Sequence, residues 1–126
     1  MTPALEEAHR LLRLALRDSD TVELLLPLPK ATMAAIGFHA QQAAEKALKA
    51  VCTLRNIEIR RTHDLAALAQ TLVVDGITLP VSVDEFRTLN PFAVEYRYDD
   101  EITSPMTREE LKNIVAKVLA WTQLQF

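Results

Sequence analysis

The side chains best suited to chemistry lie in two short segments and on one helical stripe. His63 stands between Thr62 and Asp64, where the pattern predicts the start of a helix. An imidazole titrates near neutral pH and can either donate or accept a proton. Because the backbone N–H groups of a helix start favour an anion, His63 is a candidate phosphate ligand. The alternative is that residues 62–64 cap the helix and fix the loop before it.

A second candidate segment is an arginine between two aromatic residues. Arg97 lies between Tyr96 and Tyr98. A guanidinium group can bind a phosphate with two parallel hydrogen bonds while a neighbouring ring stacks on a base. The sequence therefore makes Tyr96 and Arg97 candidates for nucleotide or RNA binding. The alternative is a structural arginine that pairs with an acid such as Glu45 or Asp64.

The polar stripe consists of His39, Gln42, Lys46 and Lys49, which follow one another at steps of three, four and three. Such steps place side chains on one face of an α-helix. The stripe could line a polar groove, in which Lys46 and Lys49 would contact phosphate. The alternative is that it forms the solvated face of its helix.

Metal and cofactor signals are weak throughout the chain. Three acids, Asp99, Asp100 and Glu101, could offer oxygen ligands to Mg²⁺, but adjacent residues rarely all point at one ion. The three histidines and the single cysteine, Cys52, lack the spacing of a zinc site. No phosphate-binding glycine loop, dinucleotide fingerprint or nucleophile elbow is found. We therefore expect no metal and no cofactor.

Length and composition set the frame for these residues. The chain has 126 residues, so we expect one domain over residues 1–126. A net charge of −3 provides no general attraction to nucleic acid or an anionic membrane, so any phosphate site must be a local cluster. No stretch resembles a signal peptide or a membrane span. One cysteine fits a reducing compartment, and we expect a cytoplasmic protein.

The periodicity of apolar residues predicts helices throughout and shows no sustained alternation of the kind that strands require. The second predicted helix is rich in alanine and contains Gly37, which favours close packing on several sides. Leucines 24–26 are assigned to a short turn or helix that ends at Pro27. The predicted fold is an all-α, up-and-down bundle of four to five helices. The predicted ranges are about 3–18, 30–55, 63–74, 83 onward with an interruption at Asn90-Pro91, and 107 to about 123.

Local signals predict where these helices begin and end. Asn56 is the expected stop of the second helix, and Gly76 can provide the left-handed residue that ends the third. Thr62 is the expected N-cap of the third helix. Ser82 and Thr107 each precede a glutamate by three residues, which is the capping-box pattern.

Three pieces of the chain together resemble the HEPN domains (higher eukaryotes and prokaryotes nucleotide-binding). The pieces are QQAAEKALKA at residues 41–50, THDL at residues 62–65 and YRY at residues 96–98, in this order and spacing. The resemblance extends over about residues 4–122, nearly the whole chain. It implies a helical up-and-down bundle that is usually a homodimer, in agreement with the fold predicted above.

The resemblance also implies a class of function. Many prokaryotic members accompany a minimal nucleotidyltransferase in a toxin–antitoxin or related system. Members that are metal-independent ribonucleases carry an Arg-x(4–6)-His motif, which is absent at every arginine of this chain. We therefore expect a non-catalytic module that binds a nucleotide or RNA phosphate and pairs with such a partner. A ribonuclease with a rearranged site, in which Arg97 meets His63, and a purely structural bundle are the alternatives.

Overall fold

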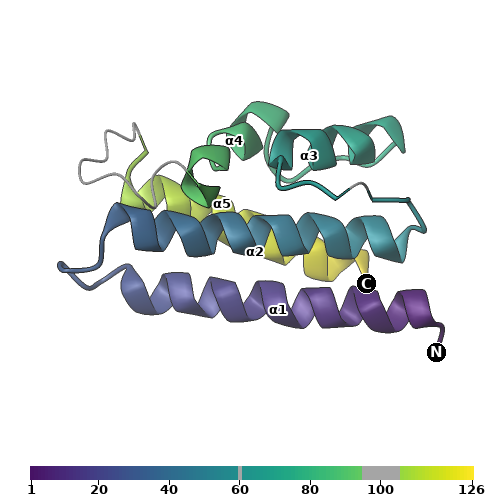
Figure 1. Ribbon diagram of the computed structural model, residues 1–126, viewed down its shortest axis with the longest axis horizontal. Coiled ribbons are helices and arrows are strands. Elements are labelled where there is room, and N and C mark those ends of the chain that lie inside the picture. Colours follow the sequence, from purple (N-terminus) through teal and green to yellow (C-terminus); the bar gives the residue numbers. More distant parts are fainter. Residues whose placement is uncertain (60, 95–105) are drawn as a thin grey trace.

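The computed structural model describes residues 1–59, 61–94 and 106–126. Within these residues every regular element is helical, which confirms the predicted all-α bundle (Figure 1). None of the described helices is long and apolar enough to cross a membrane. The elements are α1 (Pro3–Leu25), α2 (Met33–Leu54), α3 (Leu65–Val74), α4 (Val83–Arg87), the 3₁₀ turn η1 (Asn90–Ala93) and α5 (Arg108–Gln125).

Helix α2 is the centre of the bundle, as its alanine content predicts. It lies beside α1 along its length and also contacts α3, η1 and α5 (Figure 1). Small side chains allow these neighbours to approach its backbone closely. Its fully buried alanines are Ala40, Ala43, Ala47 and Ala50.

The predicted end of the first helix near residue 18 is wrong, because α1 continues without a break to Leu25. The sequence around residues 18–20 contains two aspartates and a serine, which are poor helix formers in isolation. In the fold, Ala15, Asp18 and Val22 face α2 and are buried. Tertiary packing along this face therefore overrides the weak local propensity, and residues 24–25 belong to the helix rather than to a separate turn.

The predicted helix ends at Asn56 and Gly76 are confirmed. Both residues adopt the left-handed conformation, with φ of 58° and 87°. In each case the N–H of the next residue donates to the carbonyl five residues before it, at 2.9 and 3.0 Å. This geometry closes the exposed carbonyl end of a helix and turns the chain away from it.

The helix starts agree with prediction only in part. The capping box of Ser82 with Glu85 is complete. The assignment of Thr62 as the N-cap of the third helix is wrong, because the Asp64 carboxylate accepts from the backbone N–H groups of Ala66 and Ala67 at the start of α3. Thr62 instead accepts a hydrogen bond from the N–H of Asp64 at 3.0 Å. The N-cap is therefore Asp64 instead of Thr62, and α3 begins at Leu65 instead of residue 63.

At the start of α5, Thr107 is the N-cap, as predicted. Its hydroxyl accepts from the N–H of Glu110 at 3.1 Å and lies 3.2 Å from a carboxylate oxygen of the same residue. The glutamate thus accepts from the threonine hydroxyl, so the predicted capping box takes a modified form. The cap still satisfies one of the free N–H groups of the helix start.

Gly37 on α2 is required by the packing of η1. The ring of Phe92, which is fully buried, occupies the space where a Cβ atom on residue 37 would lie. Only a glycine leaves room for the Phe92 ring. Because glycine is a poor helix former, this contact lowers the intrinsic stability of α2 at residue 37. The residues that lead from η1 toward Tyr96 and Arg97 therefore start from a fixed position on α2.

Arg108, the first residue of α5, binds the loop between α1 and α2. Its guanidinium donates to the carbonyl oxygens of Leu26 and Leu28 at 2.8 and 2.9 Å, and also contacts those of Pro29 and Ala31. The rigid fork of five N–H donors allows one arginine to serve several carbonyl groups. The C-terminal helix is thus anchored to the N-terminal pair of helices.

Candidate functional site

A buried carboxylate on α1 organises the first polar cluster. Asp18 is 8% exposed, and its two oxygens lie 3.2 Å from Nδ1 of His39 and 2.5 Å from Nζ of Lys46. We call Asp18, His39 and Lys46 the Asp18 cluster. Sequence reasoning missed Asp18, although a signal exists. It is a charged residue within the apolar stripe, three residues after Ala15 and four before Val22.

A second buried carboxylate, Glu45 on α2, organises the Glu45 cluster with Gln41, Lys49 and His63. Glu45 is 5% exposed. One oxygen accepts from Nε2 of Gln41 at 3.0 Å and lies 2.9 Å from Nδ1 of His63, and the other accepts from Nζ of Lys49 at 3.1 Å. Glu45 and Lys49 therefore form an ion pair one helical turn apart on α2.

The Glu45 carboxylate is stabilised as an anion by its donors. Burial raises the pKa of this carboxyl, but hydrogen bonds from His63, Gln41 and Lys49 outweigh burial and bring the pKa below its ordinary value. Glu45 is therefore ionised at neutral pH. Its buried negative charge fixes the side chains around it.

The position of His63 follows from this carboxylate. A carboxylate only accepts hydrogen bonds, so Nδ1 of His63 carries the proton that faces Glu45. The side chain of His63 is 75% exposed. In the neutral ring, Nε2 then has a free lone pair, and in the charged ring it is a donor. The residue predicted from sequence is thus an oriented imidazole, not only part of a helix cap.

The two predicted lysine ligands are already paired with acids. Lys46 bonds to Asp18 and Lys49 to Glu45, and their side chains are 22% and 21% exposed. Each cluster therefore has no net charge while its histidine is neutral, and a charge of +1 when the histidine is protonated. A phosphate at this surface would share the lysines with the carboxylates, so the histidines control the local charge.

The predicted polar stripe on α2 is not a simple solvated face. His39 and Lys46 turn toward α1, whereas Lys49 turns toward Glu45 and the loop that carries His63. Gln42 donates to the side chain of Gln41 at 2.7 Å, which extends the Glu45 cluster along the helix. The stripe therefore joins two clusters on one helix.

The remaining sequence-based candidates lie outside the described residues. These are Tyr96, Arg97 and Tyr98, together with the acidic run at residues 99–101. Whether Arg97 approaches His63 is therefore left as a prediction. Among the described residues, no group of three or more histidine, cysteine, aspartate or glutamate side chains could hold a metal ion.

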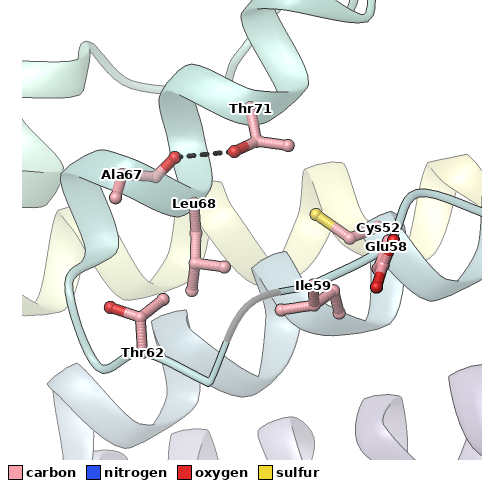
Figure 2. Close-up of a pocket in the computed structure, with 7 residues that line it drawn as sticks. All are labelled: Cys52, Glu58, Ile59, Thr62, Ala67, Leu68 and Thr71. Atoms are coloured by element: carbon pink, nitrogen blue, oxygen red, sulfur yellow. Dashed lines mark hydrogen bonds between the residues drawn. The ribbon is translucent and has the colours of Figure 1, made fainter.

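A pocket of about 560 Å³ lies between the end of α2, the loop residues Glu58, Ile59 and Thr62, and α3, and Thr62 directly precedes His63 of the Glu45 cluster. Figure 2 shows the Cys52 thiol and the Leu68 side chain together in this region. Burial, with a smaller effect of the Asp75 charge, raises the pKa of Cys52 to about 11, so the thiol is a poor nucleophile. Cys52 is a buried residue of α2. The pocket is lined by Cys52, Glu58, Ile59, Thr62, Ala67, Leu68 and Thr71.

Fold and clusters together define a small all-α bundle with a histidine-bearing polar surface on its central helix. The chain belongs to the HEPN domain family, whose model matches residues 8–125. This match confirms the resemblance seen in residues 41–50, 62–65 and 96–98. No curated protein and no solved structure matches the chain.

Proposed function

We propose that this chain is a non-catalytic HEPN module that binds the phosphate of a nucleotide or RNA at the Glu45 cluster. The observation that carries the proposal is the pair formed by Glu45 and His63. A buried carboxylate orients the imidazole through Nδ1, so that Nε2 is available to a ligand beside Lys49. The absence of the Arg-x(4–6)-His motif supports a binding role rather than cleavage.

The net charge of the Glu45 cluster depends on the protonation state of His63. With neutral His63, the charges of Glu45 and Lys49 cancel, and a phosphate gains little from electrostatics. With protonated His63, the cluster is positive and Nε2 donates to a phosphate oxygen. We therefore expect phosphate to bind the cluster more tightly when His63 is protonated.

Titration calorimetry with ribose 5-phosphate tests this role. Replacing His63 by alanine should weaken binding by about tenfold or more, because a hydrogen bond to a charged group contributes about 1.5–3 kcal/mol. His9→Ala is the matched control, since His9 packs on Phe126 with ring centroids 5.0 Å apart. Equal affinity of wild type and His63→Ala would contradict the proposal.

Family membership supports two further parts of the proposal: a homodimer, and a minimal nucleotidyltransferase as partner in a toxin–antitoxin-like system. Size-exclusion chromatography with light scattering tests the dimer. Co-expression with any nucleotidyltransferase encoded next to this gene tests the partner, and failure to co-elute would count against it. We further propose a cytoplasmic location, on the basis of the single unpaired cysteine.

A metal-independent ribonuclease is the second candidate, because a carboxylate that orients an imidazole is also the arrangement of a general base. RNA cleavage in EDTA distinguishes the two. We expect none, whereas cleavage that is lost in both His63→Ala and Glu45→Gln would favour the ribonuclease. If neither nucleotides nor RNA bind or react, the purely structural bundle is the remaining interpretation.

A further inference from the structure

We propose that the pocket between α2 and α3 receives the base of the nucleotide whose phosphate contacts the Glu45 cluster, and that it favours guanine. This inference rests on the proposed function and adds the identity of the ligand. Within the part of the chain that the structure describes, this pocket adjoins the cluster at two independent points.

The first point is the loop before α3. Thr62 lines the pocket, and the next residue is His63, whose ring contacts Glu45. The second point is α2, where Cys52 lines the pocket three residues after Lys49. Residues three apart on a helix are surface neighbours, roughly 5–6 Å apart at Cβ. The pocket and the cluster thus adjoin along the chain, through the loop before α3 and through one turn of α2.

The pocket has a volume suited to a small molecule. Its volume of about 560 Å³ lies within the range of roughly 300–1,000 Å³ typical of small-molecule sites. Ile59 and Ala67 supply accessible apolar surface, whereas Leu68 and Cys52 also line the pocket but are almost fully buried. A nucleobase stacks well on such surfaces, whereas a sugar or a bare phosphate does not.

The polar groups of the pocket select the edge of the base. Glu58 is exposed, and its carboxylate has no hydrogen-bond partner within residues 1–59, 61–94 and 106–126. A carboxylate can only accept, so it matches a ligand edge with two adjacent N–H donors. Guanine presents such an edge at N1 and its 2-amino group. The corresponding edge of adenine has one donor, the 6-amino group, and one acceptor, N1. The N1 acceptor would face the negative charge of the Glu58 carboxylate.

The two hydroxyl groups add a donor and an acceptor. The Thr62 hydroxyl accepts from the N–H of Asp64, so its own proton is free to be donated to the ligand. The Thr71 hydroxyl donates to the carbonyl of Ala67 at 2.9 Å, as Figure 2 shows, and retains a free lone pair. Together with Glu58, these groups can serve a base without leaving its polar atoms unpaired.

A pair of tryptophan substitutions on α3 tests the pocket. Ala67→Trp places an indole on the exposed wall of the pocket and should block the base. Gln70→Trp adds the same side chain one turn further along α3, at a residue that does not line this pocket. Both positions are exposed, so neither substitution disturbs the core. Circular dichroism and thermal unfolding confirm that both variants fold.

Calorimetry with 5′-GMP, 5′-AMP, guanosine and ribose 5-phosphate provides the measurement. In the wild type we expect 5′-GMP to bind at least tenfold more tightly than ribose 5-phosphate and more tightly than 5′-AMP. Ala67→Trp should reduce 5′-GMP to the affinity of ribose 5-phosphate, and Gln70→Trp should leave the ratio unchanged. Glu58→Gln should remove the preference for 5′-GMP over 5′-AMP.

The outcomes separate this inference from the function on which it rests. Equal affinities for 5′-GMP and ribose 5-phosphate would overturn the base pocket and leave phosphate binding intact. Equal loss of 5′-GMP binding in both tryptophan variants would overturn it as well. Guanosine binding without ribose 5-phosphate binding would overturn the phosphate site and retain the pocket. No binding of any ligand would overturn both.

Discussion

Substitution of Gly37 by alanine tests the packing of η1 on α2, because two physical effects oppose each other there. Alanine is the better helix former, by about 0.5–1 kcal/mol in a helix interior. The added Cβ, however, would lie well inside 3.0 Å of the Phe92 ring, a separation that real Cβ atoms essentially never show. The ring is fully buried, so it has no solvent-facing space into which it can move.

The net effect should be destabilising. Overpacking of a well-filled core costs about 1–3 kcal/mol. After subtraction of the gain in helix propensity, we expect the free energy of unfolding to fall by about 1–2 kcal/mol. For a chain of this length, that corresponds to a decrease in Tm of roughly 3–10 °C.

Urea and thermal unfolding of four proteins measure this effect in a double-mutant cycle. The proteins are wild type, Gly37→Ala, Phe92→Ala and the double variant. Phe92→Ala is destabilising by itself, but it removes the ring atoms that the new methyl group meets. Gly37→Ala should therefore be neutral or stabilising in that background, with a coupling energy of about 1–3 kcal/mol. A Gly37→Ala variant that is more stable than wild type would refute the reasoning.

Three further predictions concern other parts of the fold. Arg108→Lys should lower the free energy of unfolding by about 1–3 kcal/mol in urea titrations, because an ammonium cannot bind the several carbonyl groups of the 26–31 loop at once. Equal stability of the variant and wild type would contradict the anchoring role of Arg108. Because the folded pKa of Glu45 is lowered, its contribution to stability is present above its ordinary value of 4.5 and is lost as the pH falls through the folded pKa. Unfolding measured across the acid range should thus show a weaker pH dependence in Glu45→Gln, and an unchanged acid limb would contradict this. At mildly alkaline pH, Cys52 should react ~100-fold more slowly with iodoacetamide in the folded than in the unfolded protein. A pKa of about 11 in place of 9.0 reduces the thiolate fraction by that factor. Similar rates would disprove burial of the thiol.

The sequence was sufficient wherever structure is determined by near neighbours. Asn56 and Gly76 end their helices through hydrogen bonds within six residues, and Ser82 caps α4 through a residue three positions away. The course of α1 could not be predicted in this way. Asp18 is compatible with a buried helical face because its partners, His39 and Lys46, follow 21 and 28 residues later. A local sequence pattern cannot show that the charge of Asp18 is neutralised by residues so far along the chain.

The candidate site shows the same division. His63 and Lys49 are recognisable from residue type and spacing, and both belong to the Glu45 cluster. The burial of Glu45 and its role as the common acceptor depend on how the loop before α3 folds back on α2. The pocket is even harder to predict from the sequence, because residues from three separate segments form its wall. The segment that carries Tyr96 and Arg97 keeps its role as a prediction.

The anchoring of the α1–α2 loop by Arg108 has a consequence for the order in which the chain folds. Helices α1 and α2 are neighbours in sequence and can pair as soon as both have left the ribosome, whereas the guanidinium that binds their loop follows some 80 residues later. Until α5 arrives, the carbonyl of Leu26 has only water as a partner, and that of Leu28 accepts only from the N–H of Ala31. Docking of α5 is therefore the step that commits an early helical hairpin to the complete bundle, and nascent chains that stop before residue 108 should remain sensitive to proteolysis in that loop.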